Sequence, residues 1–320
     1  MSHVAIIGGG VAGLCSAWFL RKEGFDVTVI DRAPGIGCSC GNAGMIVPSH
    51  FIPLASPGMP WKGIKMLFRP NGPFAITPRL DPDLIRWAWT FYRKSNTRHV
   101  KSSMDLLWRI NHESGTLYEE FSQMDGFDFH LEKKGLIVYC RNKETLNHEK
   151  NVAEQANHVG AVAKVMDKEQ LEELDPGVKL NVKGGVYYPG DAFFDPGIFM
   201  KQLGDKLRKK SVRFEDRKVS DFRIDGNKLY IKDLEVDKVV IAAGVWSSGL
   251  LDKLGISMPM QGGKGYSFTL DSPEQIPNIC SILLEARIAV TPMNGNLRFA
   301  GTMQLDGTNE SISAKRLEGL

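Results

Sequence analysis

Six residues near the N-terminus have the types and spacing of a phosphate-binding turn: Gly8, Gly9, Gly10, Val11, Ala12 and Gly13. They follow the apolar stretch 4–7 directly and open a stretch with helical periodicity over 11–23. The first glycine permits a tight turn, the third lets backbone approach a pyrophosphate, and the last allows a helix to pack closely on a strand. The N-terminus of that helix would offer free N–H groups to phosphate. The pattern therefore predicts a site for the diphosphate of a dinucleotide.

The context of this turn strengthens the prediction. A glycine pattern alone is weak evidence, but here an acid, Asp31, ends the next apolar strand at the distance that a βαβ unit requires. Its carboxylate can accept hydrogen bonds from the hydroxyls of an adenosine ribose. The alternative, a glycine turn that binds no ligand, leaves this combination of strand, helix and acid unexplained.

The turn does not distinguish a flavin from a nicotinamide cofactor, and two other features favour the flavin. A loop of mostly small residues, 32–44, follows the acid and could admit a ribityl-diphosphate tail past the backbone. A late apolar strand, 239–243, ends in Gly244, where a second contact could form. Ordinary packing of a tight loop and a buried strand remains the alternative for each, and a nicotinamide-dependent dehydrogenase remains open.

Around this turn, the sequence alternates helical and strand patterns. Prolines between residues 49 and 82 exclude long regular elements there. Asp167 with Gln170 predicts a capping box. In the helix expected over 104–124, one face holds Leu107, Ile110, Leu117, Phe121 and Met124. Further elements are expected as helices over 84–93 and 195–210, strands over 135–140, 185–188 and 236–243, a hairpin over 222–231, and a C-terminal β-meander.

Composition excludes several classes of function. A net charge of +3 is too small to indicate a nucleic-acid partner. The pair Cys38 and Cys40 has neither zinc nor thioredoxin spacing, and the histidines are scattered, so no metal site is predicted. Neither a secretory signal nor a membrane-spanning stretch is visible. A cytoplasmic protein with reduced cysteines is expected.

Several stretches together carry a resemblance to a known family. They are 4–20, 27–32, Ser39 with 42–44, the proline-rich 55–60 with 64–65, 184–186, 243–244 and 264–267. In these the chain resembles the D-amino acid oxidase superfamily of FAD-dependent oxidoreductases and, within it, the bacterial D-amino acid dehydrogenases. The glycine motifs are common, whereas the proline-rich stretch is the specific part of the likeness.

The resemblance implies an α/β fold with a Rossmann-like FAD-binding domain and an inserted α+β substrate domain built on a mixed sheet. The FAD-binding domain would comprise residues 1–50 and 195–258, and the substrate domain 51–194 and 259–320. The residues that would line FAD are Gly8, Gly9, Gly10, Val11, Ala12, Gly13, Asp31, Arg32, Ser39, Asn42, Ala43, Gly44, Val219, Ala243 and Gly244.

The resemblance also implies a reaction: oxidation of a D-amino acid such as D-alanine by hydride transfer to flavin N5, followed by hydrolysis to a 2-oxo acid and ammonia. Oxidation of sarcosine, glycine or D-hydroxyproline is the alternative within the superfamily, and a non-catalytic FAD-binding protein is the alternative outside catalysis. His50 and Tyr266 are the candidates for the substrate pocket. A solvated loop histidine and a core tyrosine are the competing interpretations.

Two further expectations concern the end of the chain and its partners. Family members carry a later Gly-Leu-Arg-Pro segment whose arginine grips the substrate carboxylate, so the resemblance implies that these 320 residues are either a fragment or a truncated protein. A respiratory-chain electron acceptor is implied, with peripheral contact to the inner membrane. The candidate surface for that contact, which could instead pack inward as a cover, combines Trp61, Ile64, Leu67 and Phe68 with Lys62, Lys65 and Arg69.

Overall fold

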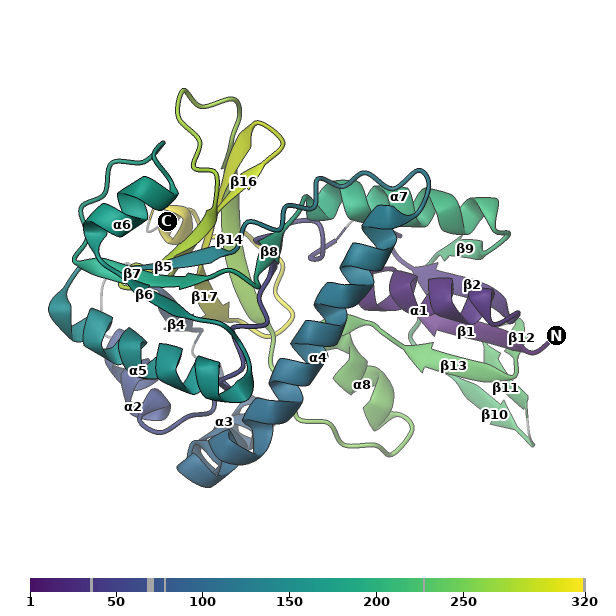
Figure 1. Ribbon diagram of the computed structural model, residues 1–320. Helices are drawn as coiled ribbons and strands as arrows, with labels where there is room; N and C mark the ends of the chain where they lie inside the picture. The colour runs from purple at the N-terminus through teal and green to yellow at the C-terminus, as the bar shows by residue number, and fades with distance from the viewer. Residues whose placement is uncertain (35–36, 68–71, 78, 227, 319–320) are drawn as a thin grey trace. The chain divides into compact units, whose positions relative to one another are not determined.

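The chain divides into two compact units in the computed structural model, which describes residues 1–34, 37–67, 72–77, 79–226 and 228–318 (Figure 1). One unit comprises residues 1–42 and 196–262, and the other comprises 43–195 and 263–320. Residues 43–50, which the sequence analysis assigns to the FAD-binding domain, therefore group with the second unit. The reason is that β3 (Met45–Ile46) pairs with β8 (Ala192–Phe193) of that unit.

The first unit is built on a parallel sheet. Its strand order is β13-β1-β2-β9, and helix α1 packs on β1, β2 and α7 (Figure 1). The β-branched and apolar side chains of β1 and β2 are buried, as expected for strands covered on both faces. The bounds are β1 (His3–Ile7), α1 (Val11–Lys22), β2 (Asp26–Asp31), α7 (Pro196–Lys209), β9 (Arg213–Asp216), β13 (Lys238–Ile241), η1 (Gly244–Trp246) and α8 (Ser247–Asp252).

A small antiparallel sheet joins this unit, with β10 (Arg223–Asp225), β11 (Lys228–Ile231) and β12 (Leu234–Val236). The pairing of Asp225 with Lys228 confirms the hairpin that the sequence predicts over 222–231. Asn227, at its turn, lies outside the described residues.

The second unit is built on a mixed sheet with the order β14-β17-β16-β15-β5-β7-β6 and β4 paired to β17. The pairs β15–β5 and β17–β4 are parallel and the others are antiparallel. The predicted mixed sheet is therefore confirmed. Its strands are β4 (Phe74–Ile76), β5 (Leu136–Cys140), β6 (Lys164–Met166), β7 (Gly184–Tyr188), β14 (Gly263–Leu270), β15 (Cys280–Leu283), β16 (Ile288–Met293) and β17 (Asn296–Leu305).

The helices of this unit include one confirmed and one partly wrong prediction. The capping box of α6 is formed by Asp167 and Gln170, as predicted. Helix α4 starts earlier than predicted because the Asn96 side chain accepts the His99 N–H at its N-terminus. Ile110 is exposed rather than inward-facing, whereas Leu107 and Leu117 are half-buried and Phe121 is buried, so only part of the predicted face is covered. The bounds are α2 (Met59–Leu67), α3 (Pro82–Lys94), α4 (Thr97–Gln123), α5 (Lys143–Val159), α6 (Lys168–Leu174) and α9 (Ala314–Leu317).

Candidate functional site

The glycine turn joins β1 to α1 and leaves no room for side chains at two positions. Gly8 has φ +116°, and a Cβ placed on it would lie 2.2 Å from the Ala242 carbonyl oxygen. A Cβ on Gly13 would lie 1.8 Å from the Gly8 carbonyl oxygen. These distances are far inside van der Waals contact, so both glycines are required by the fold itself. They bring the helix N-terminus and the end of β13 against the end of β1.

Gly10 is different, because packing within the protein gives little reason for a glycine at this position. It is the N-cap residue of α1 in extended conformation, and its would-be Cβ meets only the Ser39 hydroxyl oxygen, at 3.2 Å. The N-cap has no side-chain hydrogen bond, and the first turn of α1 contains no acidic residue. The positive end of the helix is thus left for an external anion, and a cradle that a Cβ would fill fits the diphosphate of FAD.

Ser39 and Asp31 shape the two sides of this cradle. The Val11 N–H donates to the Ser39 hydroxyl over 3.0 Å. The Asp31 carboxylate accepts the Gly9 N–H at 2.6 Å and the Ala33 N–H at 2.7 Å. Asp31 therefore holds the turn to the loop after β2, a structural task that the sequence analysis did not foresee. A carboxylate has further acceptor positions, so a ribose hydroxyl can still bind there.

Arg32 links this loop to the end of β13. Its guanidinium lies 4.6 Å from the centre of the Trp246 ring, which follows the predicted FAD contacts Ala243 and Gly244. Because β2 and β13 both run parallel to β1, their ends lie at the same edge of the sheet, where parallel α/β sheets bind their ligands. Trp246 was not predicted from the sequence, because it lies far from the glycine motif and no local pattern marks it.

The remaining predicted cofactor residues are more widely distributed. Asn42 donates to the Ser39 carbonyl oxygen at 2.5 Å. Ala43 and Gly44 belong to the second unit, where Thr291 donates to the Ala43 carbonyl oxygen and the Phe194 N–H to that of Gly44. Val219 packs beside the apolar cluster beneath β1. Its contact with FAD stays a prediction.

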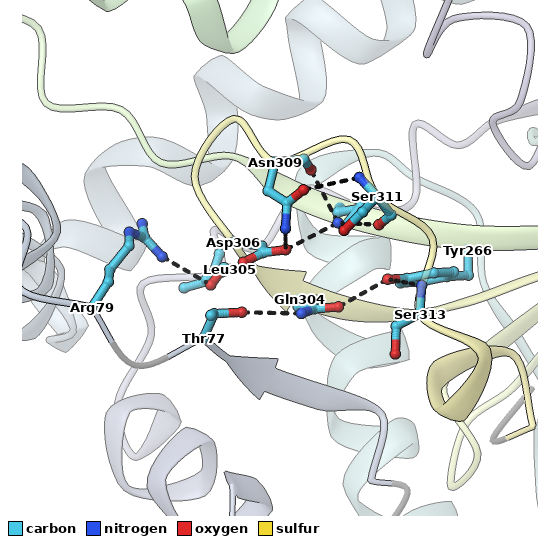
Figure 2. Close-up of polar contacts among 10 residues, drawn as sticks. Thr77, Arg79, Tyr266, Gln304, Leu305, Asp306, Asn309, Ser311 and Ser313 are labelled. Atoms are coloured by element: carbon cyan, nitrogen blue, oxygen red, sulfur yellow. Dashed lines mark hydrogen bonds and ion pairs between the residues drawn. The ribbon is translucent and has the colours of Figure 1, made fainter.

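Tyr266 lies in a network of polar side chains in the second unit (Figure 2). Its buried hydroxyl donates to Gln304 Oε1 at 2.9 Å and accepts the Ser313 N–H at 3.4 Å, while Gln304 Nε2 donates to the Thr77 hydroxyl at 3.0 Å. The register of β14 and β17 shifts between Gly265 and Tyr266. The tyrosine hydroxyl thus fastens β14 to its neighbours.

His50 belongs to a different network. Its Nδ1 lies 3.1 Å from the Ser49 hydroxyl, which donates to the buried Asp191 carboxylate at 2.5 Å. Desolvation of the imidazole lowers the pKa of His50 from its ordinary value, although the residue keeps an exposed face. The structure therefore does not bring His50 and Tyr266 into one hydrogen-bonded group.

No group of three or more histidine, cysteine, aspartate or glutamate side chains in the described ranges could hold a metal ion. Within the same ranges, no helix is long and apolar enough to cross a membrane.

Comparison with known proteins gives one family. The profile of the FAD dependent oxidoreductase family matches residues 3–320. A D-amino acid dehydrogenase of Neisseria meningitidis is 31% identical over 332 aligned positions, which cover 99% of this chain and 79% of that protein. The crystal structure of glycine oxidase from Geobacillus kaustophilus superposes with a TM-score of 0.74 at 20% identity, over 100% of this chain and 76% of the other.

A further structure, the reduced L-α-glycerophosphate oxidase of Mycoplasma pneumoniae with FAD bound, superposes with a TM-score of 0.69 at 17% identity, covering 98% of this chain and 76% of that one. At these identities the structural likeness establishes the fold. The profile match over almost the whole chain establishes more: the chain belongs to the family of FAD-dependent oxidoreductases.

Proposed function

We propose that this protein oxidises the amine of a D-amino acid, such as D-alanine, to an imino acid that water hydrolyses to a 2-oxo acid and ammonia. The observation that carries the proposal is the likeness to the D-amino acid dehydrogenase of N. meningitidis, which extends over 99% of the chain. The cradle at Gly10 supports the cofactor part, because its shape and the exposed helix N-terminus suit a diphosphate.

The residues of the first unit would hold the cofactor. The N–H groups at the start of α1 and the Ser39 hydroxyl would bind the diphosphate, and Asp31 would accept a hydrogen bond from the ribose. The other contacts of the proposal are the predicted residues from Arg32 to Gly44, with Val219, Ala243 and Gly244. FAD, when bound, supplies the hydride acceptor.

The second unit would position the substrate. An amine loses hydride readily only in its neutral form, so the protein must hold the Cα–H in place and remove a proton from the ammonium group. The Tyr266 hydroxyl already donates to Gln304, so Tyr266 is better suited to lining the substrate pocket than to accepting a proton. His50 keeps a ring nitrogen without a partner among the described residues and is the better candidate for polar contact.

Anaerobic reduction of the bound flavin tests this function. D-Alanine and a panel of other D-amino acids should bleach the flavin absorbance, and the matching L-isomers should leave it oxidised. Glycine, sarcosine and D-hydroxyproline are tested in parallel. If only these bleach the flavin, the substrate is one of them and not a D-amino acid such as D-alanine. A protein that binds FAD and is bleached by none of them would have a non-catalytic role.

We also propose that the electrons pass to a respiratory-chain acceptor at the inner membrane, with α2 and α3 forming the contact. On α3, Ile85, Trp89 and Tyr92 are exposed at helical spacing and stand beside Arg86 and Arg93. An exposed aromatic stripe with cations is the composition of an interfacial helix.

The surface expected from the sequence on α2 is described in part. Trp61, Lys62, Ile64 and Lys65 are exposed, and the Lys65 ammonium lies 5.7 Å from the centre of the Trp61 ring. Phe68, Arg69 and the side chain of Leu67 lie outside the described residues. The exposed aromatic side chains favour docking over the inward-facing cover.

A further inference from the structure

A buried carboxylate and an exposed imidazole are joined by a single hydroxyl in the second unit. The Ser49 hydroxyl lies 2.5 Å from Asp191 Oδ2 and 3.1 Å from His50 Nδ1. The Ser49 N–H also donates to Asp191 Oδ1, at 3.2 Å. Asp191 and Ser49 are 2% and 6% exposed, so water does not compete for these bonds. The three groups form a continuous hydrogen-bonded path from the surface into the unit.

The order of donors along this path determines the tautomer of His50. A serine hydroxyl has one proton, and the ionised Asp191 carboxylate can only accept, so Ser49 donates to Asp191. The Ser49 oxygen must then accept from His50, which places the imidazole proton on Nδ1. In the neutral ring Nε2 carries a lone pair. Among the described residues, Nε2 has no hydrogen-bond partner.

The surroundings of Asp191 favour the uptake of a proton. Burial raises the pKa of Asp191 to about 7, against the effect of the two hydrogen bonds from Ser49. The titratable groups that face it are Tyr188 from β7 and Cys280 from β15; burial raises the pKa of both, and the negative charge of Asp191 raises them further. Behind Tyr188 stands Glu149 of α5, a further acid.

We propose that His50, Ser49 and Asp191 form a proton relay that takes a proton from the ammonium group of the substrate. The N–H bond of the substrate breaks as Nε2 of His50 gains the proton, and the substrate nitrogen keeps the electron pair. The Nδ1 proton passes to the Ser49 oxygen, and the hydroxyl proton of Ser49 passes to Asp191 Oδ2. Asp191 ends as the neutral acid, and reversal of the path returns the proton to solvent at His50.

This relay rests on the proposed amine oxidation and names the proton acceptor of that reaction. His50 would touch the substrate, whereas Ser49 and Asp191 act through it as positioning residues. The segment that carries His50 begins at Ala43 and Gly44, two of the predicted flavin contacts, and is fastened by β3 to the strand that directly follows Asp191. Asn111 of α4 holds the His50 carbonyl oxygen at 3.2 Å.

Nitrogen NMR of the protein carrying ¹⁵N-histidine tests the order of the hydrogen bonds without any substrate. The signal of His50 is the one that disappears in His50→Gln. Above a pH of about 8, where the imidazole is neutral, we expect the Nδ1–H tautomer in the wild type. In Asp191→Asn the new amide donates to Ser49, which must then donate to Nδ1, so the Nε2–H tautomer should appear. The relay would be overturned if the wild type showed the Nε2–H tautomer, or if Asp191→Asn left the tautomer of His50 unchanged.

The pH dependence of anaerobic flavin reduction tests its role in the reaction. Near neutral pH, His50→Gln, Ser49→Ala and Asp191→Asn should slow the limiting rate by about 100-fold, the scale of general-base catalysis. Their rates should approach the wild-type value as the pH nears the pKa of the substrate amine, because the relay is then unnecessary. Ser49→Thr retains the hydroxyl and should restore the rate near neutral pH.

The outcomes separate the relay from the proposed function. His112→Gln, on the exposed side of α4, is the matched histidine control and should behave as the wild type. A loss that is equal at every pH would show a structural role and reject the relay. A wild type that no amino acid reduces would reject the proposed function and remove the substrate from the relay, while the NMR result would still decide the hydrogen-bond order.

Discussion

The carbonyl oxygen of Gly8 occupies the place where a Cβ of residue 13 would stand, at 1.8 Å. Helix α1 thus lies so close to the end of β1 that only glycine fits between them. Gly10, three positions earlier, faces open space instead, apart from the Ser39 hydroxyl. The two glycines of one motif therefore serve different purposes, the first packing and the second cofactor binding.

This difference predicts opposite results for two alanine variants. Gly13→Ala must displace α1 from β1 and should lower the free energy of unfolding by about 1–3 kcal/mol or more, the cost of overpacking a core. Gly10→Ala should change the unfolding free energy by less than ~0.5 kcal/mol and weaken FAD binding at least about tenfold, with Gly10→Val abolishing it. Denaturant unfolding of the apoprotein and FAD titration measure both. A Gly10→Val protein that retains full flavin content would refute the assignment of the cradle.

Tyr266→Phe tests whether that tyrosine serves the fold or the substrate. The change leaves the half-buried Gln304 Oε1 without its donor, which should cost about 1 kcal/mol of stability. We expect the rate of flavin reduction to change by less than about threefold, that is, by under ~0.7 kcal/mol in the barrier. Thermal unfolding and stopped-flow absorbance provide the two numbers, with the exposed Tyr92→Phe as control. A large loss of rate at unchanged stability would place the hydroxyl on the substrate.

Asp191 should make the stability of the protein depend on pH. Its pKa is raised from 3.8 to about 7 by burial, so between these values the folded protein binds a proton that the unfolded chain has released. This contribution to stability is fully present below pH 3.8 and is lost as the pH rises through about 7. Relative to Asp191→Asn, the wild type should therefore lose unfolding free energy as the pH rises from 3.8 to about 7. A difference that stays constant with pH would contradict the raised pKa.

The proposed membrane contact predicts salt-sensitive binding to anionic vesicles. Wild-type protein should sediment with them at low salt and be released as salt rises, because charge attraction is screened within about 10 Å at 0.1 M salt. Pairing Trp61→Ser with Lys65→Glu, or Trp89→Ser with Arg93→Glu, should reduce sedimentation without changing flavin content. The matched control pairs Ile224→Ser with Arg223→Glu on the first unit. A wild type that stays in the supernatant at low salt would end the proposal.

Local signals made parts of both units predictable from sequence. The glycine turn, the acid after β2 and the capping box at Asp167 each depend on residues close together in the chain, and each is present as predicted. The burial of α4 was less predictable, since a helix of 27 residues drifts relative to any short apolar repeat. Ile110 fits the repeat and is nevertheless exposed.

The prolines of residues 49–82 keep the regular elements there short without excluding them. They were expected to exclude long regular elements, and α2 with nine residues and β4 with three are indeed short. Pro60 does not interrupt α2, however, because it lies in the first turn, where no backbone donor is needed.

The polar networks of the second unit could not be predicted, because they depend on tertiary contacts. Ser49 and Asp191 lie 142 positions apart in the chain, and Tyr266 and Gln304 lie 38 apart. No periodicity relates such residues. His50 could be chosen for its position after the flavin loop, but its tautomer follows only from the partner that the fold places beyond Ser49.

The central strand of the first unit has a consequence for how the protein is made. β1 pairs with β13, and Val4 lies opposite Lys238, so this strand pair cannot form until residue 238 has been synthesised. At a synthesis rate of ~5–20 residues per second, that delay is roughly 10–50 s on the ribosome. During this time one edge of a buried, β-branched strand lacks its neighbour, and such edges invite aggregation. Chaperone dependence during translation should therefore be concentrated in the first unit, and it should end when β13 has left the exit tunnel.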